Sequence, residues 1–460
     1  MAGFNTKTTQ QWRISSATIT ADRGVNIDVT DKIVEMKLYE NIYFPFVSGQ
    51  VAIGDNIGLL NKIGVMGTER LNVVVEGESY GEEVPSEDGL KGKVFVMKRL
   101  SNQVKANSEK TSAVAIFDLI EEHVVASNVQ KISRTIKEDF LLEILKLTSD
   151  MGIAVDITQA KPAKQTKWKA YIPYLSPLDA IRWLIERATT NGEMPYVLYS
   201  SMHNRNIKLA SLDTLMQQSP FNPTTPYVYS SATVQNQEYS ADRSSPDLRD
   251  LSEKHWHITN MKADHMQDQL EMTQKGAATG SRITVTNING ANPLISTKHN
   301  SMIDTLGKMS PLFRGLPQNV YDEAYNVVGA GPMHDNEAAQ YHKIVSENTF
   351  TQRFKDFHYE ESIDEYMPVL TANAVKASMQ KNTFTIEING SELLKQKKGV
   401  GDLINLLVYA DSVDLENAEE KIDKLKSGVF LITAVAHTFK VPDHKAVLEV
   451  TKFSKDPSLG

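Results

Sequence analysis

Residues 428–453 read GVFLITAVAHTFKVPDHKAVLEVTKF. Two runs in this stretch, Gly428 to Phe439 and Ala446 to Phe453, alternate between apolar and polar residues around Val441-Pro442-Asp443-His444. Alternation with a period of two is typical of a strand with one buried face, and a Pro-Asp step suits a turn. The stretch therefore predicts a β-hairpin and points to a mainly β protein.

The hairpin belongs to a stretch that repeats an earlier part of the sequence at a constant separation of 335 positions. About 45 residues align without a gap, in the order strand, polar segment, Gly-Val step, strand, acidic loop and hairpin. A long internal repeat indicates two copies of one structural unit, and chance similarity is the alternative. The matching positions are Val51 and Ile386, Ile53 and Ile388, Leu59 and Leu394, Gly64-Val65 and Gly399-Val400, Leu71 and Leu406, Val73 and Val408, Leu90-Lys91 and Leu425-Lys426, and Val94-Phe95 and Val429-Phe430.

The first copy reads as mainly β. Strand-like alternation occurs within Ser16 to Tyr39 and again at Arg70 to Val75. Two apolar segments, Lys93 to Leu100 and Ala113 to Ile120, flank the polar stretch Ser101 to Ser112. These segments predict a hairpin with a long solvated arm.

Between the two copies lies an insertion of different character. Thr135 to Asp150 places apolar residues at helical spacing, and Ser176-Pro177-Leu178-Asp179 is a helix cap with proline in the first turn. Pro195 to Ser200 and Ile207 to Leu209 predict a short hairpin. The insertion therefore starts with a small α/β domain.

The rest of the insertion is rich in Pro, Asn, Ser, Thr and Gly. It predicts a loop-rich domain with scattered strands such as Arg282 to Thr286, followed by a helix from about Asp364 to Gln380. The expected fold class is α+β, mainly β. The expected domains are a first β unit at residues 1–125, the small α/β domain at 126–218, the loop-rich domain at 219–345 and a second β unit at 346–460.

Composition limits the possible functions. The 460 residues suffice for three or four domains, and 41% hydrophobic with 23% charged residues is ordinary for a soluble globular protein. Met1 to Arg13 is polar and no run of 18 apolar residues occurs, so we expect cytoplasmic synthesis and no membrane partner. The net charge of −8 disfavours general binding to nucleic acid. The absence of cysteine excludes disulfides, thiolate zinc sites and cysteine nucleophiles.

Few residues suggest chemistry. His255-Trp256-His257 with Asp264 and His265 has enough imidazole and carboxylate groups for zinc, but packing of Trp256 in a protein contact is the simpler interpretation. The acidic loops 76–88 and 414–423 lack the ligand spacing of a calcium loop, and the glycines of 328–332 lack the Lys-Ser/Thr of a phosphate loop. We therefore expect no catalytic, cofactor-binding or metal-binding residues, and no cofactor.

Three stretches carry a resemblance to a known family. They are Phe44-Pro45-Phe46-Val47-Ser48-Gly49, the helix start from Ser176 to Leu184, and the terminal hairpin from Gly428 to Lys452. The sequence resembles the baseplate hub proteins of contractile-tailed bacteriophages, which are related to the hub part of type VI secretion spike proteins. Members carry two tail-tube-like β-barrel modules with an inserted domain, so the resemblance implies that both β units are such barrels. The loop-rich segment does not match the family.

The resemblance also implies a function. A homotrimer would present six barrel modules and join the hexameric tail tube to the threefold central spike, next to the baseplate wedge proteins. DNA would pass through its channel without specific binding during ejection. The protein would be a structural component of the virion tail, assembled in the host cytoplasm, and not an enzyme. The alternatives are another tube-related baseplate adaptor, or a peptidoglycan-degrading hub enzyme with its activity between Ser219 and Gly331.

Overall fold

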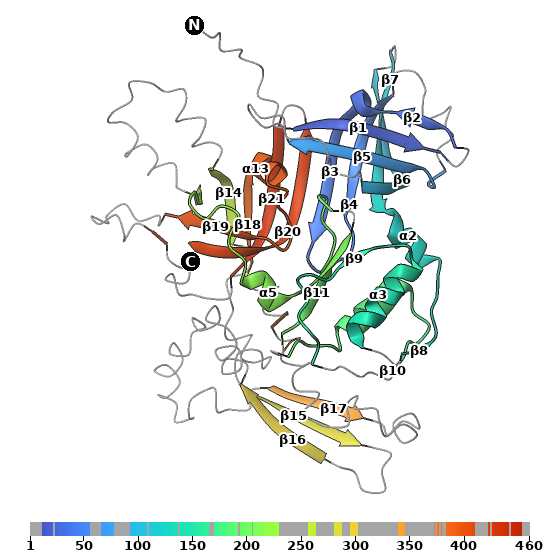
Figure 1. Cartoon of the computed structure of the whole chain (residues 1–460). Coiled ribbons are helices and arrows are strands. Elements are labelled where there is room, and N and C mark those ends of the chain that lie inside the picture. Colours follow the sequence, from blue (N-terminus) through green and yellow to red (C-terminus); the bar gives the residue numbers. More distant parts are fainter. Residues whose placement is uncertain are drawn as a thin grey trace.

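Figure 1 shows a computed structural model of the whole chain. It describes residues 12–21, 24–55, 66–77, 93–107, 110–136, 139–164, 170–191, 194–204, 206–229, 256–263, 280–287, 295–301, 339–345, 372, 375–376, 379, 383–409, 422–423, 426–440 and 443–452. These residues are mainly β, with antiparallel pairing predominant, as the alternation in the sequence predicts. No helix among them has both the length and the apolar character needed to cross a membrane.

One large sheet carries both β units, and Figure 1 shows its late strands beside its early ones. The strand order is β14-β18-β21-β20-β3-β4-β7-β6-β5-β1-β2, with β19 paired to β20 and β13 paired to β19. The bounds are β1 Trp12–Thr20, β2 Asn26–Asp28, β3 Ile33–Asn41, β4 Ser48–Asp55, β5 Arg70–Gly77, β6 Lys93–Asn107, β7 Lys110–Glu121, β13 Tyr227–Tyr229, β14 Ile258–Ala263, β18 Thr383–Asn389, β19 Leu403–Val408, β20 Gly428–Lys440 and β21 Asp443–Thr451, with the 3-10 turn η1 at Thr30–Lys32.

Four strands of each unit follow the same order. The order is β4-β7-β6-β5 in the first unit and β18-β21-β20-β19 in the second, antiparallel throughout. A bulge interrupts β6 between Met97 and Arg99, and a bulge interrupts β20 between Ile432 and Ala434, 335 positions later. A bulge marks a specific backbone position, so its recurrence shows that the repeat extends to the hydrogen-bonding pattern.

The gap-free alignment of the two copies is wrong at one strand. Leu71 pairs with Phe95, and the residue that pairs with the equivalent Phe430 is Ile404 rather than Leu406. The second copy is therefore two residues shorter before this strand. Because side chains alternate with period two, a shift of two keeps an apolar residue facing inward at each matched position, and the sequence pattern could not show the gap.

The long arm of the first unit is built from strand rather than loop. The polar stretch from Ser101 to Ser112 was expected to be a solvated arm, and β6 continues through it to Asn107 before β7 starts at Lys110. The second hairpin is four residues shorter, because Met97 pairs with Leu119 whereas Ile432 pairs with Val450.

Among the described strands, one pair joins the two units. Ala434 to Lys440 in β20 pairs antiparallel with Glu35 to Asn41 in β3, while the start of β20 pairs with β19 along the same edge. The result is one continuous open sheet, and neither unit closes into a barrel within the described ranges. The mainly β class is thus confirmed, and the barrel architecture is not.

Each unit buries one face of this sheet. Trp12 ties the first unit to the second hairpin, because its indole N–H donates to the carbonyl of Asp443 at 2.8 Å and its ring lies 5.1 Å from that of Phe439. The first core includes Trp12, Ala17, Ile19, Met36, Leu38, Val51, Ile53, Leu71, Val73, Phe95, Phe117 and Leu119. The second includes Tyr199, Tyr227, Ile258, Val375, Met379, Ile386, Ile388, Ile404, Leu406, Phe430, Ile432, Val435, Leu448 and Val450.

The α/β region has a core of its own. Helix α4, Pro177–Ile185, starts where the sequence predicts, with the Ser176 hydroxyl accepting from the backbone N–H of Asp179 at 3.3 Å. Helix α3 starts later than predicted, at Phe140, because Asp139 caps it and Thr135–Ile136 forms strand β8. The other elements are α2 Glu122–Asn128, β9 Val155–Asp156, β10 Ala170–Tyr171, β11 Tyr196–Tyr199, β12 Ile207–Ser211 and α5 Leu212–Met216.

The remaining described elements are short. The predicted strand at Arg282 to Thr286 is confirmed as part of β15, Gly280–Asn287, which pairs with β16, Ile295–Ser301, and β17, Ala339–Val345. Helix α13, Ser391–Lys395, follows β18. Of the helix predicted from Asp364 to Gln380, the described residues 372, 375–376 and 379 are helical, and the rest lies outside the described ranges.

Candidate functional site

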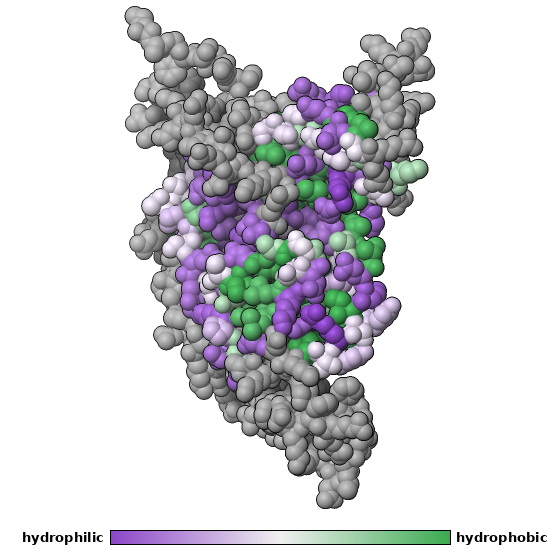
Figure 2. All heavy atoms as spheres, turned by 45° about the vertical axis from the view of Figure 1, so that its right-hand side comes forward, coloured by the Kyte–Doolittle hydropathy of each residue, from purple (hydrophilic) through white to green (hydrophobic). Residues whose placement is uncertain are grey.

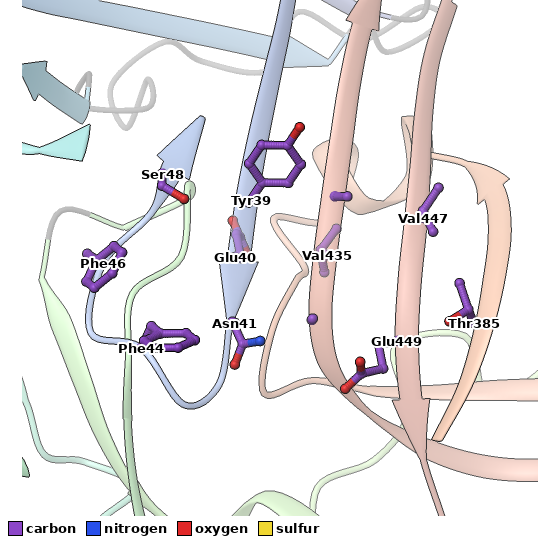
Figure 3. Close-up of a pocket in the computed structure, with 12 residues that line it drawn as sticks. Tyr39, Glu40, Asn41, Phe44, Phe46, Ser48, Thr385, Val435, Val447 and Glu449 are labelled. Carbon is purple, nitrogen blue, oxygen red and sulfur yellow. The ribbon is translucent and has the colours of Figure 1, made fainter. Parts of the chain in front are cut away.

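The outer face of the sheet crosses the junction between the two units without interruption. Figure 3 shows Tyr39 and Asn41 on β3, Val447 and Glu449 on β21, and Thr385 on β18 around one hollow. The hollow has a volume of about 450 Å³, and its other lining residues are Glu40, Phe44, Phe46, Ser48, Ala434, Val435 and Ala436. Strands from both copies of the repeat thus form a single hollowed surface.

Charges on this outer face are mixed in sign. Lys37 lies 3.2 Å from Glu35 on β3, and Lys445 on β21 lies 3.3 Å from Glu387 on β18. Exposed ion pairs of this kind contribute about 0 to 1 kcal/mol to stability, so they do little to hold the strands together. Because each pair combines a positive and a negative charge, the pairs give this face no strong electrostatic field of one sign. A field of one sign would attract or repel a polyanion.

Glu40 lies on the opposite, buried face, directly beneath the junction. Its carboxylate accepts hydrogen bonds from the backbone N–H of Met202 at 2.5 Å, the backbone N–H of Val400 at 3.3 Å and the Ser201 hydroxyl at 3.4 Å. One side chain therefore joins β3 to the α/β region and to the second unit. Burial raises the pKa of Glu40 to about 7 against the lowering effect of these hydrogen bonds.

Three histidines are buried in this part of the fold, and one of them, His437, lies next to Glu40. His437 Nε2 lies 3.9 Å from Glu40 Oε1, and His437 Nδ1 lies 3.1 Å from Nε2 of His444. The Phe439 ring stacks on that of His444 at 4.3 Å. Burial lowers the pKa of His437 well below its usual value, the pKa of His444 to about 3 and the pKa of His203 to about 4. The imidazoles are neutral near pH 7 and pack the interior.

A second buried charged group ties the first unit to the α/β region. Lys93 Nζ lies 2.5 Å from Glu121 Oε1 and donates to the Ser200 hydroxyl at 2.5 Å. The other carboxylate oxygen of Glu121 accepts from the backbone N–H of Val47 at 2.5 Å. The Lys93 and Glu121 side chains are 5% and 4% exposed, so neither is placed to reach a substrate.

These buried groups were not singled out from the sequence, although a signal existed. Glu40 follows Met36 and Leu38 at the inward phase of β3, where an apolar residue is expected. Lys93 immediately precedes an apolar strand run and is itself buried. A charged residue at an inward strand position indicates a buried polar contact, but its partners lie far away in the sequence.

Only Trp256 and His257 of the histidine cluster considered for zinc lie within the described ranges. Trp256 packs on the second core, with its ring 4.9 Å from that of Tyr227. Burial lowers the pKa of the adjacent His257. His255, Asp264 and His265, the acidic loops 78–88 and 414–421, and residues 328–332 lie outside the described ranges. Within those ranges no three His, Asp or Glu side chains are grouped to hold a metal ion.

Another surface of the α/β region is partly apolar. Figure 2 shows hydrophobic side chains among hydrophilic ones on the side of the molecule at the right of Figure 1. The exposed apolar residues of α2, α3 and their flanks are Val125 at 37%, Val129 at 78% and Leu142 at 52% exposure.

Comparisons with known proteins concern the fold. No family model and no curated protein matches the chain. The tail protein from Neisseria meningitidis MC58 superimposes with a TM-score of 0.51 at 10% identity, over 96% of this chain and 97% of that one. The 43 kDa tail protein of prophage MuSo2 from Shewanella oneidensis gives 0.49 at 10% identity, over 97% and 99%. Prophage tail protein gp18 from Listeria monocytogenes EGD-e gives 0.42 at 10% identity, over 96% of each chain.

The likeness to the Neisseria protein extends over nearly the full length of both chains. At 10% identity it shows a shared fold. The resemblance to phage tail proteins that the sequence predicts is therefore confirmed at the level of the fold.

Proposed function

We propose that the chain is a structural hub subunit of a contractile phage-tail baseplate. In this proposal three chains form a pseudo-sixfold ring that joins the hexameric tail tube to the threefold central spike, beside the baseplate wedge proteins. Residues 1–125 and 346–460 are the tube-like modules of the ring, and residues 126–218 and 219–345 are the inserted domains. The protein then resides in the virion tail after assembly in the host cytoplasm.

The observation that carries the proposal is the β20–β3 pair. It joins two units of equal strand order edge to edge, with both buried faces on one side of the sheet. A ring built from repeated units needs such a joint, because each unit must offer one edge to the unit before it and one to the unit after it. The joint also supports the proposal by pairing edges that would otherwise promote aggregation.

The outer face suits the lining of a DNA channel. Its described strands carry positive and negative side chains in ion pairs, such as Lys37 with Glu35 and Lys445 with Glu387. They also carry small side chains at Ala434 and Ala436. A lining of this kind does not retain phosphates by releasing counterions, and the chain as a whole has a net charge of −8. DNA would pass along it during ejection without being bound.

A structural role in place of an enzymatic one fits the buried polar groups. Glu40, His437 and Lys93 have partners inside the fold and little or no exposed surface. An enzyme would need such groups beside an accessible pocket. The hollow at the junction is lined mainly by the outward side chains of a continuous sheet, and Glu40, which also borders it, is 2% exposed.

The test is the solution mass of the protein by light scattering, alone and co-expressed with the spike protein encoded beside it. We expect three times 51.3 kDa, with the mass of the spike added where it is present. Averaged electron-microscopy images of the same particle should show threefold symmetry with six similar lobes. A strict monomer in both samples would refute the hub.

A further inference from the structure

We infer that the free edge of β6 pairs antiparallel with β14 of a second copy of this chain. The pair would reproduce between chains the joint that β20 and β3 form within one chain. The inference rests on the proposed ring, and it names the two strands that close it. It is argued from the repeat in three steps.

The first step concerns β6. β20 uses one edge for two partners, since residues up to Leu431 pair with β19 and residues from Ala434 pair with β3. β6 is the counterpart of β20, and along the same edge residues up to Val96 pair with β5. The backbone N–H of Met97 donates to the carbonyl of Glu69, and beyond Met97 no strand within the described ranges pairs with that edge of β6. Among the described residues, the first unit thus lacks the neighbour that the second unit has.

The second step concerns β14, which occupies the position of β3 in the second unit. β3 pairs with β4, and β14 pairs with β18, the counterpart of β4. Both pairs carry a bulge at the same place, between Ile33 and Glu35 in β3 and between Ile258 and Asn260 in β14. The residue before the bulge is buried in both strands. β14 is therefore the structural repeat of β3, separated from it by 225 positions.

The third step is that β14, like β6, has an edge with no partner strand among the described residues. β14 is the terminal strand of the described sheet, whereas β3 is an interior strand with β20 on its other edge. The only bridge described near it, from His257 to Val228, lies before the strand. One chain therefore has a β6 edge that needs a β14 and a β14 edge that needs a β6.

The internal joint and the pairing within each hairpin fix the register between chains. β6 has a second bulge, between Leu100 and Asn102, that β20 lacks, so the counterpart of Thr438 is Val104. Lys37 pairs with Thr438 within the chain, so Lys262 of one copy should face Val104 of the next, and Met261 should face Lys105, as Met36 faces Phe439. The two edges differ, so the contact is head to tail and propagates around a ring, unlike the self-complementary contact of a twofold dimer.

Paired cysteines test this seam directly, because the chain has no cysteine of its own. We would introduce Val104→Cys with Lys262→Cys, oxidise the assembled protein and separate it on a non-reducing gel. We expect covalent species of two and three chains, which reduction returns to one chain. The pair Lys105→Cys with Met261→Cys, one position along the same strands, should behave alike.

Two controls make the result specific. Lys37→Cys with Thr438→Cys copies the geometry at the internal joint and should give a disulfide within one chain, without covalent multimers. Val104→Cys alone should give no covalent dimer. If Val104→Cys cross-links to itself, the β6 edges meet each other and the head-to-tail seam is wrong.

The remaining outcomes separate the seam from the hub. A trimer by light scattering that forms no interchain disulfide with either cysteine pair overturns the seam and leaves the proposed ring intact. A strict monomer, alone and with the spike protein, overturns both. Interchain disulfides together with a threefold mass support both.

Discussion

The carboxylate of Glu40 accepts a hydrogen bond at 2.5 Å from the backbone N–H of Met202, 162 residues further along the chain. Glu40 belongs to β3, the strand of the first unit that pairs with the second unit. The same carboxylate accepts from the backbone N–H of Val400 at 3.3 Å. The joint between the units and the docking of the α/β region therefore share one titratable group.

Glu40 should make folding stability depend on pH. Burial raises its pKa in the folded protein from the ordinary 4.5 to about 7, so between these values the folded state binds more protons than the unfolded state. Its contribution is fully present below pH 4.5 and is lost as the pH rises through 7, by roughly 3 kcal/mol in total. Glu40→Gln should remove this slope. Urea unfolding at intervals between pH 4 and 8 measures it.

The histidines near Glu40 act in the opposite direction. The pKa of His203 is lowered to about 4, so its contribution is present above pH 6.5 and is lost as the pH falls toward 4. The informative quantity is therefore the difference in unfolding free energy between wild type and Glu40→Gln at each pH. Glu387→Gln, on the outer face, is the matched control for the loss of a carboxyl group. A difference for Glu40→Gln that stays constant with pH would disprove the assignment.

Breaking the Lys93–Glu121 pair should be costly. Lys93→Met leaves a carboxylate that is 4% exposed without its cation, and such a loss costs about 3 to 5 kcal/mol. Adding Glu121→Gln removes the stranded charge and keeps an oxygen for the Val47 N–H, so the double variant should be more stable than the sum of the single effects predicts. The urea midpoints of the wild type, the two single variants and the double variant complete this double-mutant cycle.

An exposed pair provides the contrast. Arg182 and Glu186 on and after α4 lie 3.3 Å apart with 63% and 45% of their side chains exposed. Glu186→Gln should change the unfolding free energy by less than about 1 kcal/mol. Strict additivity in the Lys93 cycle, or an equal cost at Glu186, would argue against a buried ion pair.

Two glycines of β4 should respond differently to alanine. A Cβ at Gly49 would collide with the backbone carbonyl oxygen of Lys37 in the paired strand and approach Leu38 Cδ2 to 2.9 Å. Overpacking against backbone costs about 1 to 3 kcal/mol, so Gly49→Ala should lower the thermal midpoint. At Gly54 the nearest atom is Val34 Cγ2 at 3.6 Å, an ordinary contact, and Gly54→Ala should be neutral or slightly stabilising. Equal effects would contradict the close approach at Gly49.

The hydrogen bond that caps α4 should contribute to the folding stability of the protein. Ser176→Ala removes the acceptor for the Asp179 backbone N–H and should cost about 0.5 to 2 kcal/mol. Ser176→Thr keeps a hydroxyl that accepts from the Asp179 N–H and donates to the Asp179 carboxylate, and it should recover most of the loss. Thermal unfolding followed by circular dichroism measures both, and no loss in the alanine variant would show that the cap is dispensable.

The sequence by itself determined the strands, the repeat and the capped helix α4, because each depends on local patterns. Alternation around Phe430 and Leu448 marks an inward face, and Ser176-Pro177 marks a helix start, whatever the rest of the chain does. The same period of two concealed the gap before Ile404. The sequence also contained no sign that the strands extend into Ser101 to Ser112, because a polar hairpin arm has no apolar alternation.

Only the tertiary structure decided how the two copies meet. The pairing of β20 with β3 joins residues such as Lys440 and Glu35 that lie far apart in the chain, and hydrogen bonding between backbones leaves no mark on side-chain identity. The partners of Glu40 and Lys93 were hidden for the same reason. A charged residue in an inward position indicates that a partner exists, and the folded chain alone brings that partner within reach.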